Sequence, residues 1–180
     1  MPDTASLNSS PAKPAAAGAA LSEGAVAALK PDATAVDFMG ALTNLEMFSD
    51  AIKFLAQALE PKKSVAWSLK SIKEVAPPEA PEEKSALTAV EKWVAEPNDK
   101  HRRSAKSASE EAGVDTPAGC LAAAVFFVEG SIAPPDVQPL PPPPHIAGRL
   151  AACAIIMAVL AQPKEAAERY RKSIALGLKS

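Results

Sequence analysis

Residues 134–145 of the chain read PPDVQPLPPPPH, and seven of these twelve residues are proline. Proline fixes the backbone φ angle and has no amide donor, so this stretch is excluded from helix interiors and central strands. It lies between two of the most apolar segments of the sequence. We therefore expect a stiff polyproline-II connector of roughly 30 Å, at about 3.1 Å per residue, between two buried elements.

The two flanking segments, 118–128 and 146–161, have almost no polar residues. A helix that is apolar all round is normally buried, so both are predicted to be central helices. Thr116 and Pro117 form an N-cap and first-position pair before the first of them. Gly130 is the glycine expected just past its end.

The other helices are predicted from amphipathic spacing and from proline punctuation. Residues 45–59 place apolar side chains at intervals of three and four, with Asn44 as the expected N-cap. Further helices are predicted over residues 36–42, 61–75, 82–96, 98–112 and 164–179. The sequence thus predicts an all-α fold: a compact irregular bundle or short helical array of six to eight helices. The last two helices, with Pro163 at their turn, are expected to form a tetratricopeptide-like hairpin.

Composition divides the chain into a tail and one domain. Residues 1–33 are rich in Ala, Ser, Pro and Gly, and such a segment buries too little surface to offset its ordering entropy. We expect a disordered or weakly attached tail there. Residues 34–180 are expected to form a single helical domain, with the proline-rich connector at 134–144.

Charge and hydropathy exclude several classes of protein. The formal net charge is −2, so no overall field favours nucleic acid or an anionic membrane. The N-terminus lacks the pattern of a signal peptide. The longest apolar run, 150–161, is shorter than the about 20 residues that a spanning helix needs. A cytoplasmic protein is predicted, without nucleic-acid binding or membrane insertion.

The two cysteines, Cys120 and Cys153, each lie in an apolar segment. Free cysteine is commonly a small buried hydrophobe, so two buried thiols in a reducing compartment are expected. A disulfide between the two flanking helices is the alternative.

No catalytic or metal-binding constellation can be recognised. Two histidines and two cysteines far apart fit no metal-ligand spacing. Glycine-rich phosphate loops and nucleophile motifs are also missing from the sequence. We therefore predict no catalytic residue, no metal and no cofactor.

Candidate partner-binding residues occur on the polar helix and next to the proline run. Arg102, Arg103 and Lys106 form a basic face, which is either a site for an anionic partner or a solvated surface. His145 follows the prolines near a helix start. It is either a histidine that caps that helix start or a base that still needs a carboxylate or nucleophile partner.

The remaining candidates concern the prolines and the two tryptophans. Leu140 followed by four prolines, with Pro142 and Pro143 at their centre, resembles the ligand of an EVH1 domain. Trp67 and Trp93 lie at the flanks of amphipathic stripes, and they either belong to the core or stack on the prolines. In the second case the connector is a packed strut, unavailable to partners. Its short flanks and apolar neighbours favour a packed connector over a displayed ligand.

The chain also resembles an uncharacterised family of bacterial helical proteins, over about 130 residues from near Phe48 to the end. The resemblance implies a bacterial cytoplasmic helical protein, associated with secretion-system genes, and it assigns no catalytic residue. It is carried by Ala66-Trp67, Trp93-Val94-Ala95, Asn98 with Arg102-Arg103, Thr116-Pro117-Ala118-Gly119, Ala133-Pro134-Pro135-Asp136, Pro141-Pro142-Pro143-Pro144-His145 and Glu168-Arg169-Tyr170.

These observations favour a non-enzymatic protein-interaction module: an adaptor, chaperone or accessory component, in the context of a bacterial secretion system. One alternative is an enzyme or small-ligand binder with a pocket beneath the prolines, near His145, Arg149 and Trp93. A second is an immunity protein, although such proteins usually present a strongly acidic face. The sequence gives neither the identity of a partner nor an oligomeric state.

Overall fold

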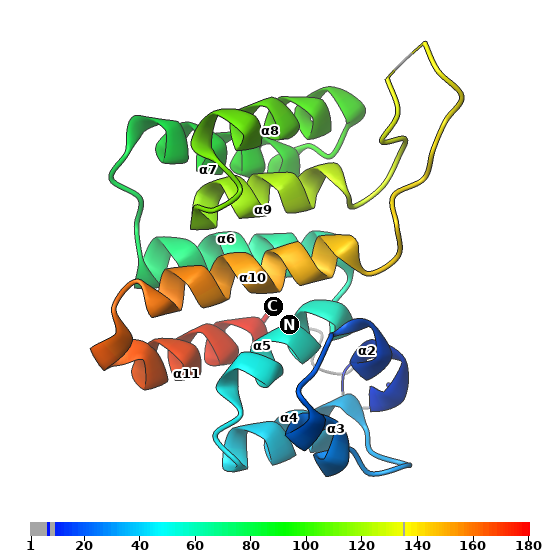
Figure 1. Cartoon of the computed structure of the whole chain (residues 1–180), viewed down its shortest axis with the longest axis vertical. Helices are drawn as coiled ribbons and strands as arrows, with labels where there is room; N and C mark the ends of the chain where they lie inside the picture. Colours follow the sequence, from blue (N-terminus) through cyan, green and yellow to red (C-terminus); the bar gives the residue numbers. More distant parts are fainter. Residues whose placement is uncertain (1–6, 8–9, 135) are drawn as a thin grey trace.

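The computed structural model describes residue 7 and residues 10–134 and 136–180. Within these residues the fold is all helical, with ten α-helices and no strand (Figure 1). The all-α prediction is confirmed. The helix count exceeds the expected six to eight, because two helices lie in the segment for which a tail was predicted.

The helices stack in layers along the long axis of the molecule (Figure 1). One end holds α7 (Pro81–Ala95), α8 (Asp99–Ala112) and α9 (Pro117–Phe126). Next come α6 (Pro61–Val75) and α10 (Ile146–Leu160), followed by α5 (Phe48–Ala58) and α11 (Ala166–Gly177). The other end holds α2 (Ala12–Gly18), α3 (Glu23–Ala28) and α4 (Ala35–Asn44).

The two apolar helices take different positions in this stack. α9 packs against α7, α8, α6 and α10, and its residues are buried almost throughout. α10 packs against α9, α6 and α5, but it leaves one side at the surface, where Cys153 and Leu160 are exposed. Burial of Cys120 is confirmed, whereas burial of Cys153 was predicted wrongly; both thiols are free.

Two of the three N-cap residues predicted from the sequence are confirmed, and one was predicted wrongly. Thr116 accepts a hydrogen bond from the amide of Gly119 at 3.0 Å, and Asn98 accepts one from His101 at 2.8 Å. Asn44, however, ends α4 instead of capping the next helix. A turn with Glu46 at φ +56° follows it, and α5 begins only at Phe48.

The N-terminal segment differs from the predicted tail over residues 10–33. Ala12, Gly18 and Ala25 are buried, in helices that pack against α5 and α4. Ser22 donates to Asp50 through both its amide and its hydroxyl, each at 2.9 Å. Each small side chain buries little area, but small side chains allow helix backbones to approach each other closely. Composition along the chain does not show which helices will pack in this way, because the contacts join residues far apart in sequence. Residues 1–6 and 8–9 of the predicted tail lie outside the described residues.

The C-terminal helices α10 and α11 meet at a bend of 105°, with a short 3₁₀ turn, Pro163–Glu165, between them. The tetratricopeptide-like character of this pair stays a prediction. Among the described residues, no single helix is long and apolar enough to cross a membrane. By length and composition, α10 and the segment Pro163–Gly177 would be long and apolar enough only when counted together, and the bend separates them.

Candidate functional site

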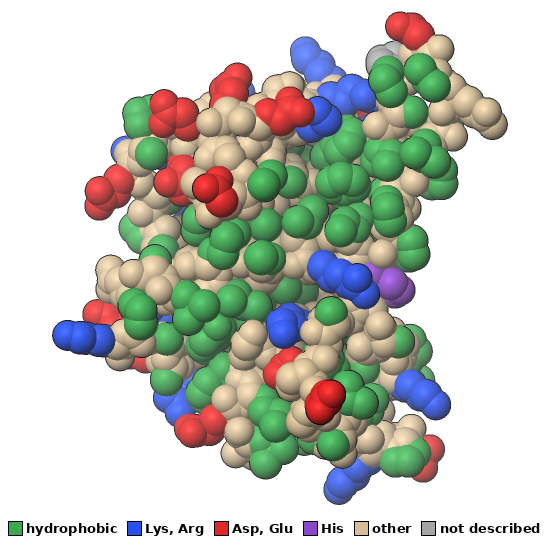
Figure 2. Space-filling view, in the orientation of Figure 1, with side chains coloured by type: hydrophobic (Ala, Val, Ile, Leu, Met, Phe, Trp, Pro, Cys, Tyr) green, Lys and Arg blue, Asp and Glu red, His purple; other side chains and the backbone are tan. Residues whose placement is uncertain are grey.

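The segment 129–145, here called the proline loop, leaves the body between α9 and α10 and projects from one corner (Figure 1). Pro141, Pro143 and Pro144 are exposed, and Leu140 is 54% exposed. Figure 2 shows the hydrophobic side chains of this corner at the surface. Of the predicted connector 134–144, Pro135 lies outside the described residues. The described part of the run is therefore displayed, with Pro142 as its half-buried member.

Hydrogen bonds close the neck of the proline loop. The amide of Ile132 donates to the carbonyl of Leu140 at 2.8 Å. The amides of Ala133 and Leu140 both donate to the hydroxyl oxygen of Ser131, at 3.1 Å each. Ser131 thus connects the outgoing and returning segments of the loop and holds Leu140, the residue before the four consecutive prolines.

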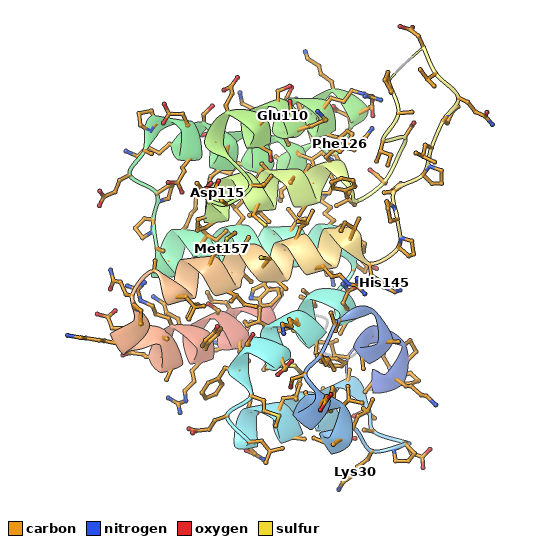
Figure 3. The ribbon with its side chains drawn as sticks, in the orientation of Figure 1. Lys30, Glu110, Asp115, Phe126, His145 and Met157 are labelled. Atoms are coloured by element: carbon orange, nitrogen blue, oxygen red, sulfur yellow. The ribbon has the colours of Figure 1, made fainter. Side chains whose placement is uncertain are left out.

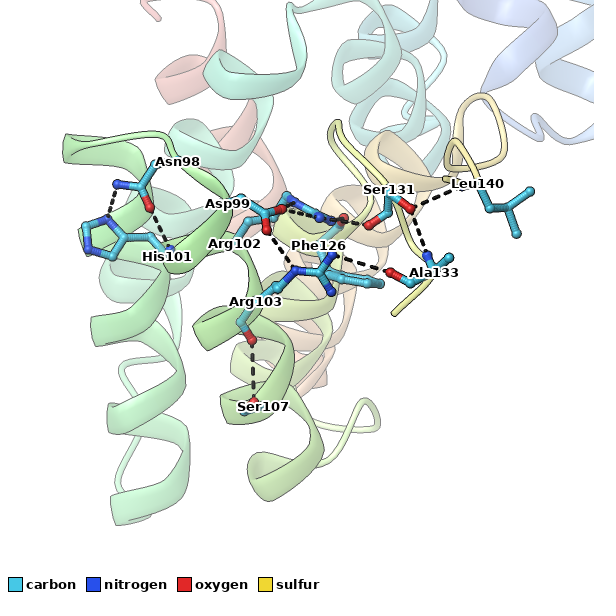
Figure 4. Close-up of polar contacts among 10 residues, drawn as sticks. All are labelled: Asn98, Asp99, His101, Arg102, Arg103, Ser107, Phe126, Ser131, Ala133 and Leu140. Atoms are coloured by element: carbon cyan, nitrogen blue, oxygen red, sulfur yellow. Dashed lines mark hydrogen bonds and ion pairs between the residues drawn. The ribbon is translucent and has the colours of Figure 1, made fainter. Parts of the chain in front are cut away.

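Arg102 fastens this neck to the body (Figure 4). The residue is only 1% exposed, and its guanidinium donates to the carbonyls of Phe126 at 2.7 Å and Ser131 at 2.8 Å. The guanidinium also donates to Asp99 and lies 4.7 Å from the centre of the Phe126 ring. A planar group with several donors in a fixed fork suits this set of acceptors better than an ammonium, which is a compact point charge.

The three residues of the predicted basic face therefore have different roles: the two arginines support the neck of the proline loop, and Lys106 lies at the surface. Arg103 donates to Asp99 at 2.8 Å and to the carbonyl of Ala133 at 3.3 Å, so it too supports the neck. Lys106 forms an ion pair with Glu110 and is partly exposed. Sequence reasoning missed Asp99 as the shared acceptor, although its spacing of three and four residues from the two arginines could have indicated it.

The pKa of Asp99 lies below its ordinary value of 3.8, because hydrogen bonds from Arg103 and then from Arg102 favour the charged carboxylate. A depressed folded-state pKa contributes stability that is present above the ordinary value and is lost as the pH falls through the folded-state pKa. We expect the difference in melting temperature between wild type and Asp99→Asn to be constant above about pH 5 and to shrink towards about pH 2. Thermal unfolding of both chains across this range checks the prediction. A difference that does not change with pH would contradict it.

The other end of the proline loop is at His145, where α10 begins (Figure 3), and it is held there by Gln57 of α5. The amide of Gln57 donates to the carbonyl of His145 at 2.9 Å, and His145 adopts a left-handed backbone with φ +66°. The ring nitrogen Nδ1 of His145 lies 3.3 Å from Oε1 of Gln57. His145 is thus the N-cap residue of α10 by backbone position, but its side chain makes no cap hydrogen bond. Its observed ring partner is an amide, where a catalytic base would need a carboxylate or a nucleophile.

A hollow of about 270 Å³ lies beneath the prolines, lined by residues that include Phe127, Pro142, Pro143 and His145. Of the three residues named for a pocket beneath the prolines, His145 lines this hollow, whereas Arg149 and Trp93 do not. Arg149 donates to the carbonyl of Gly18, and Trp93 lines a different hollow. The polar side chains that line this hollow are those of Gln57 and His145.

A second hollow, of about 840 Å³, lies between the end of α3 and α4, near the labelled Lys30 of Figure 3. Alanine, valine and glycine form much of its wall. Its polar lining residues are Lys30, Asp32, Asp37 and Asn44. The carboxylate of Asp37 is already bound to the amide and hydroxyl of Thr34 as part of the capping box of α4. Asp37 therefore has a structural role at the start of α4.

Both tryptophans belong to the core. Trp67 and Trp93 are each 1% exposed. The indole N–H of Trp67 donates to the carbonyl of Ser173 at 2.7 Å, which ties α6 to α11. These rings therefore present no surface to a partner, and the aromatic residue that lines the hollow under the prolines is Phe127.

Within the described part of the chain, no cluster of three His, Cys, Asp or Glu side chains could hold a metal ion. In comparisons with known proteins, the model of DUF6931, a family of unknown function, matches residues 38–180. No curated protein and no solved structure matches the chain. The matched region includes the proline loop, both of its anchors and the helices that carry them.

Proposed function

The chain belongs to the DUF6931 family, and from this premise we propose that it is a non-enzymatic protein-interaction module whose recognition element is the proline loop. The observation that carries the proposal is the display of Leu140 and the prolines on a neck fixed by Ser131 and Arg102. An adaptor, chaperone or accessory component is the corresponding role. The bacterial, cytoplasmic and secretion-associated setting implied by the family resemblance belongs to the same proposal.

The periodicity of a polyproline-II helix divides the run into ridges. Such a helix repeats every three residues, so Leu140 and Pro143 share one ridge, and Pro141 and Pro144 share another. All four residues are exposed, whereas Pro142, on the third ridge, is half-buried. Pro142, Pro143 and Pro144 all line the hollow beneath the run. A partner would therefore contact the exposed faces of Leu140, Pro141, Pro143 and Pro144, while Pro142 is the residue of the run that packs most against the body.

The chemistry of these ridges favours a partner with a groove lined by aromatic side chains. Proline rings and a leucine side chain pack against aromatic faces, which is how polyproline-II ligands are recognised. Because a proline run is stiff before binding, little conformational entropy is lost on association. Hydrogen bonds at both ends of the run lower that cost further, since the neck holds Leu140 and Gln57 holds His145.

The test compares partner capture by wild type and by Leu140→Ala/Pro143→Ala, using the full chain and extracts of the source organism, followed by binding measurements with the purified partner. We expect at least a tenfold loss of affinity. The melting temperature should change by less than about 3 °C, because the altered side chains are exposed and the proline contributes mainly through the unfolded state.

Leu160→Ala is the matched control, since Leu160 is 49% exposed on α10 and lies at the opposite end of that helix from the proline loop. This variant should bind like wild type. Equal affinity of the double variant and wild type would overturn the proposal. So would a large fall in its melting temperature, which would identify the proline run as a packed strut.

A further inference from the structure

Two free thiols lie at the contact between α9 and α10. The Cys120 thiol, on α9, donates to the carbonyl of Leu150 on α10 at 3.3 Å. Cys153 follows Leu150 by three residues, so it lies on the same face of α10, next to the point that Cys120 contacts. Both cysteines are free in the structure.

The two thiols have different environments. Cys120 is 2% exposed, and burial, together with the neighbouring Cys153 thiol, raises the pKa of Cys120 to about 12. Cys153 is exposed and lines an open hollow of about 190 Å³, whose other lining residues include Lys53 and Arg149. Because the nucleophile in thiol chemistry is an accessible thiolate, an oxidant reaches Cys153 first.

We propose that Cys153 and Cys120 form a site of reversible oxidative modification that reacts with low-molecular-weight disulfides. The thiolate of Cys153 attacks one sulfur of the small disulfide, whose S–S bond breaks and releases one thiolate. The sulfur of Cys120, after losing its proton to water, attacks the Cys153 sulfur and displaces the second thiolate. Two protein thiols become one disulfide, and the small disulfide is reduced to two thiols.

The disulfide would join α9 directly to α10, the two helices between which the proline loop emerges. It would enclose that loop in a covalent ring and remove conformations from the unfolded chain. We expect the oxidised protein to melt roughly 5–10 °C higher than the reduced protein. This site is independent of the proposed binding function, because thiol content and mass are read without any partner.

The experiment treats the reduced full chain with oxidised glutathione and follows free thiols, intact mass and melting temperature. Wild type should lose both thiols and end at the mass of the internally bonded monomer, through a transient glutathione adduct. Cys120→Ser should stop at a stable adduct on Cys153. Cys153→Ser should keep its thiol, because Cys120 is buried. Dithiothreitol should reverse every product.

Three results would overturn the proposal. One is a wild-type adduct on Cys153 that never converts to the internal disulfide. Another is a disulfide-linked dimer as the main product. The third is reaction of Cys120 at the same rate in Cys153→Ser as the overall rate in wild type, which would show that Cys153 is not the entry point.

Discussion

Replacing Trp67 by alanine is expected to lower the free energy of unfolding by about 4 kcal/mol, since large-to-small changes of buried aromatic residues cost roughly 3–5 kcal/mol. The ring is 1% exposed, and its N–H bonds the carbonyl of Ser173. A Cβ at Gly177 would approach the Trp67 ring to 2.6 Å, so α11 packs directly on it. Urea unfolding followed by circular dichroism measures the loss.

Trp67→Phe is the control for this prediction. It keeps most of the ring volume and removes the hydrogen bond, so we expect a loss of about 1–2 kcal/mol. If Trp67→Ala unfolded like wild type but bound a partner less tightly, the assignment of Trp67 to the core would be wrong. The ring would then be part of a binding surface.

The second large effect is expected for Arg102→Met, with a loss of about 3 kcal/mol in the free energy of unfolding. Methionine fills most of the side-chain volume, but it leaves the carbonyls of Phe126 and Ser131 without their donor. Because Ser131 also organises the neck, the amides of Ile132 and Leu140 should exchange their hydrogens faster. Denaturant unfolding and hydrogen exchange measure the two effects.

Lys106→Met is the matched control on the same helix. Lys106 is partly exposed and pairs with Glu110 at the surface, and such a pair is worth about 0–1 kcal/mol. Arg102→Lys should recover less than half of the loss, because an ammonium cannot reach both carbonyls in the same plane. Equal stability of Arg102→Met and Lys106→Met would show that the observed clamp contributes little.

Local signals in the sequence predicted much of the fold. Proline at the first position of α6, α7 and α9 and the caps Asn98 and Thr116 determined helix starts that the structure confirms. These signals are reliable because a cap or a proline acts on the backbone within one turn. Asn44 shows their limit: its side chain suits a cap, but the turn at Glu46 places it at the end of α4 instead.

The candidate site was only partly predictable. The proline run was evident, and so was the pair of alternatives, strut or displayed ligand. Its anchors were not evident, because Arg102 and Ser131 are 29 residues apart in the sequence and meet only through the packing of α8 against α9. The same packing turned a residue that suggested an anion site into a buried clamp.

The sequence by itself determined the helical class, most helix boundaries and the stiffness of the proline run. Each of these follows from backbone preferences within a few residues. Tertiary structure alone decided that small residues at the N-terminus pack on α5, that Arg102 faces inward and that Cys153 is exposed beside buried Cys120. Those outcomes depend on which helix faces meet, and that choice is made by the free energy of the whole packed chain, not by any one segment.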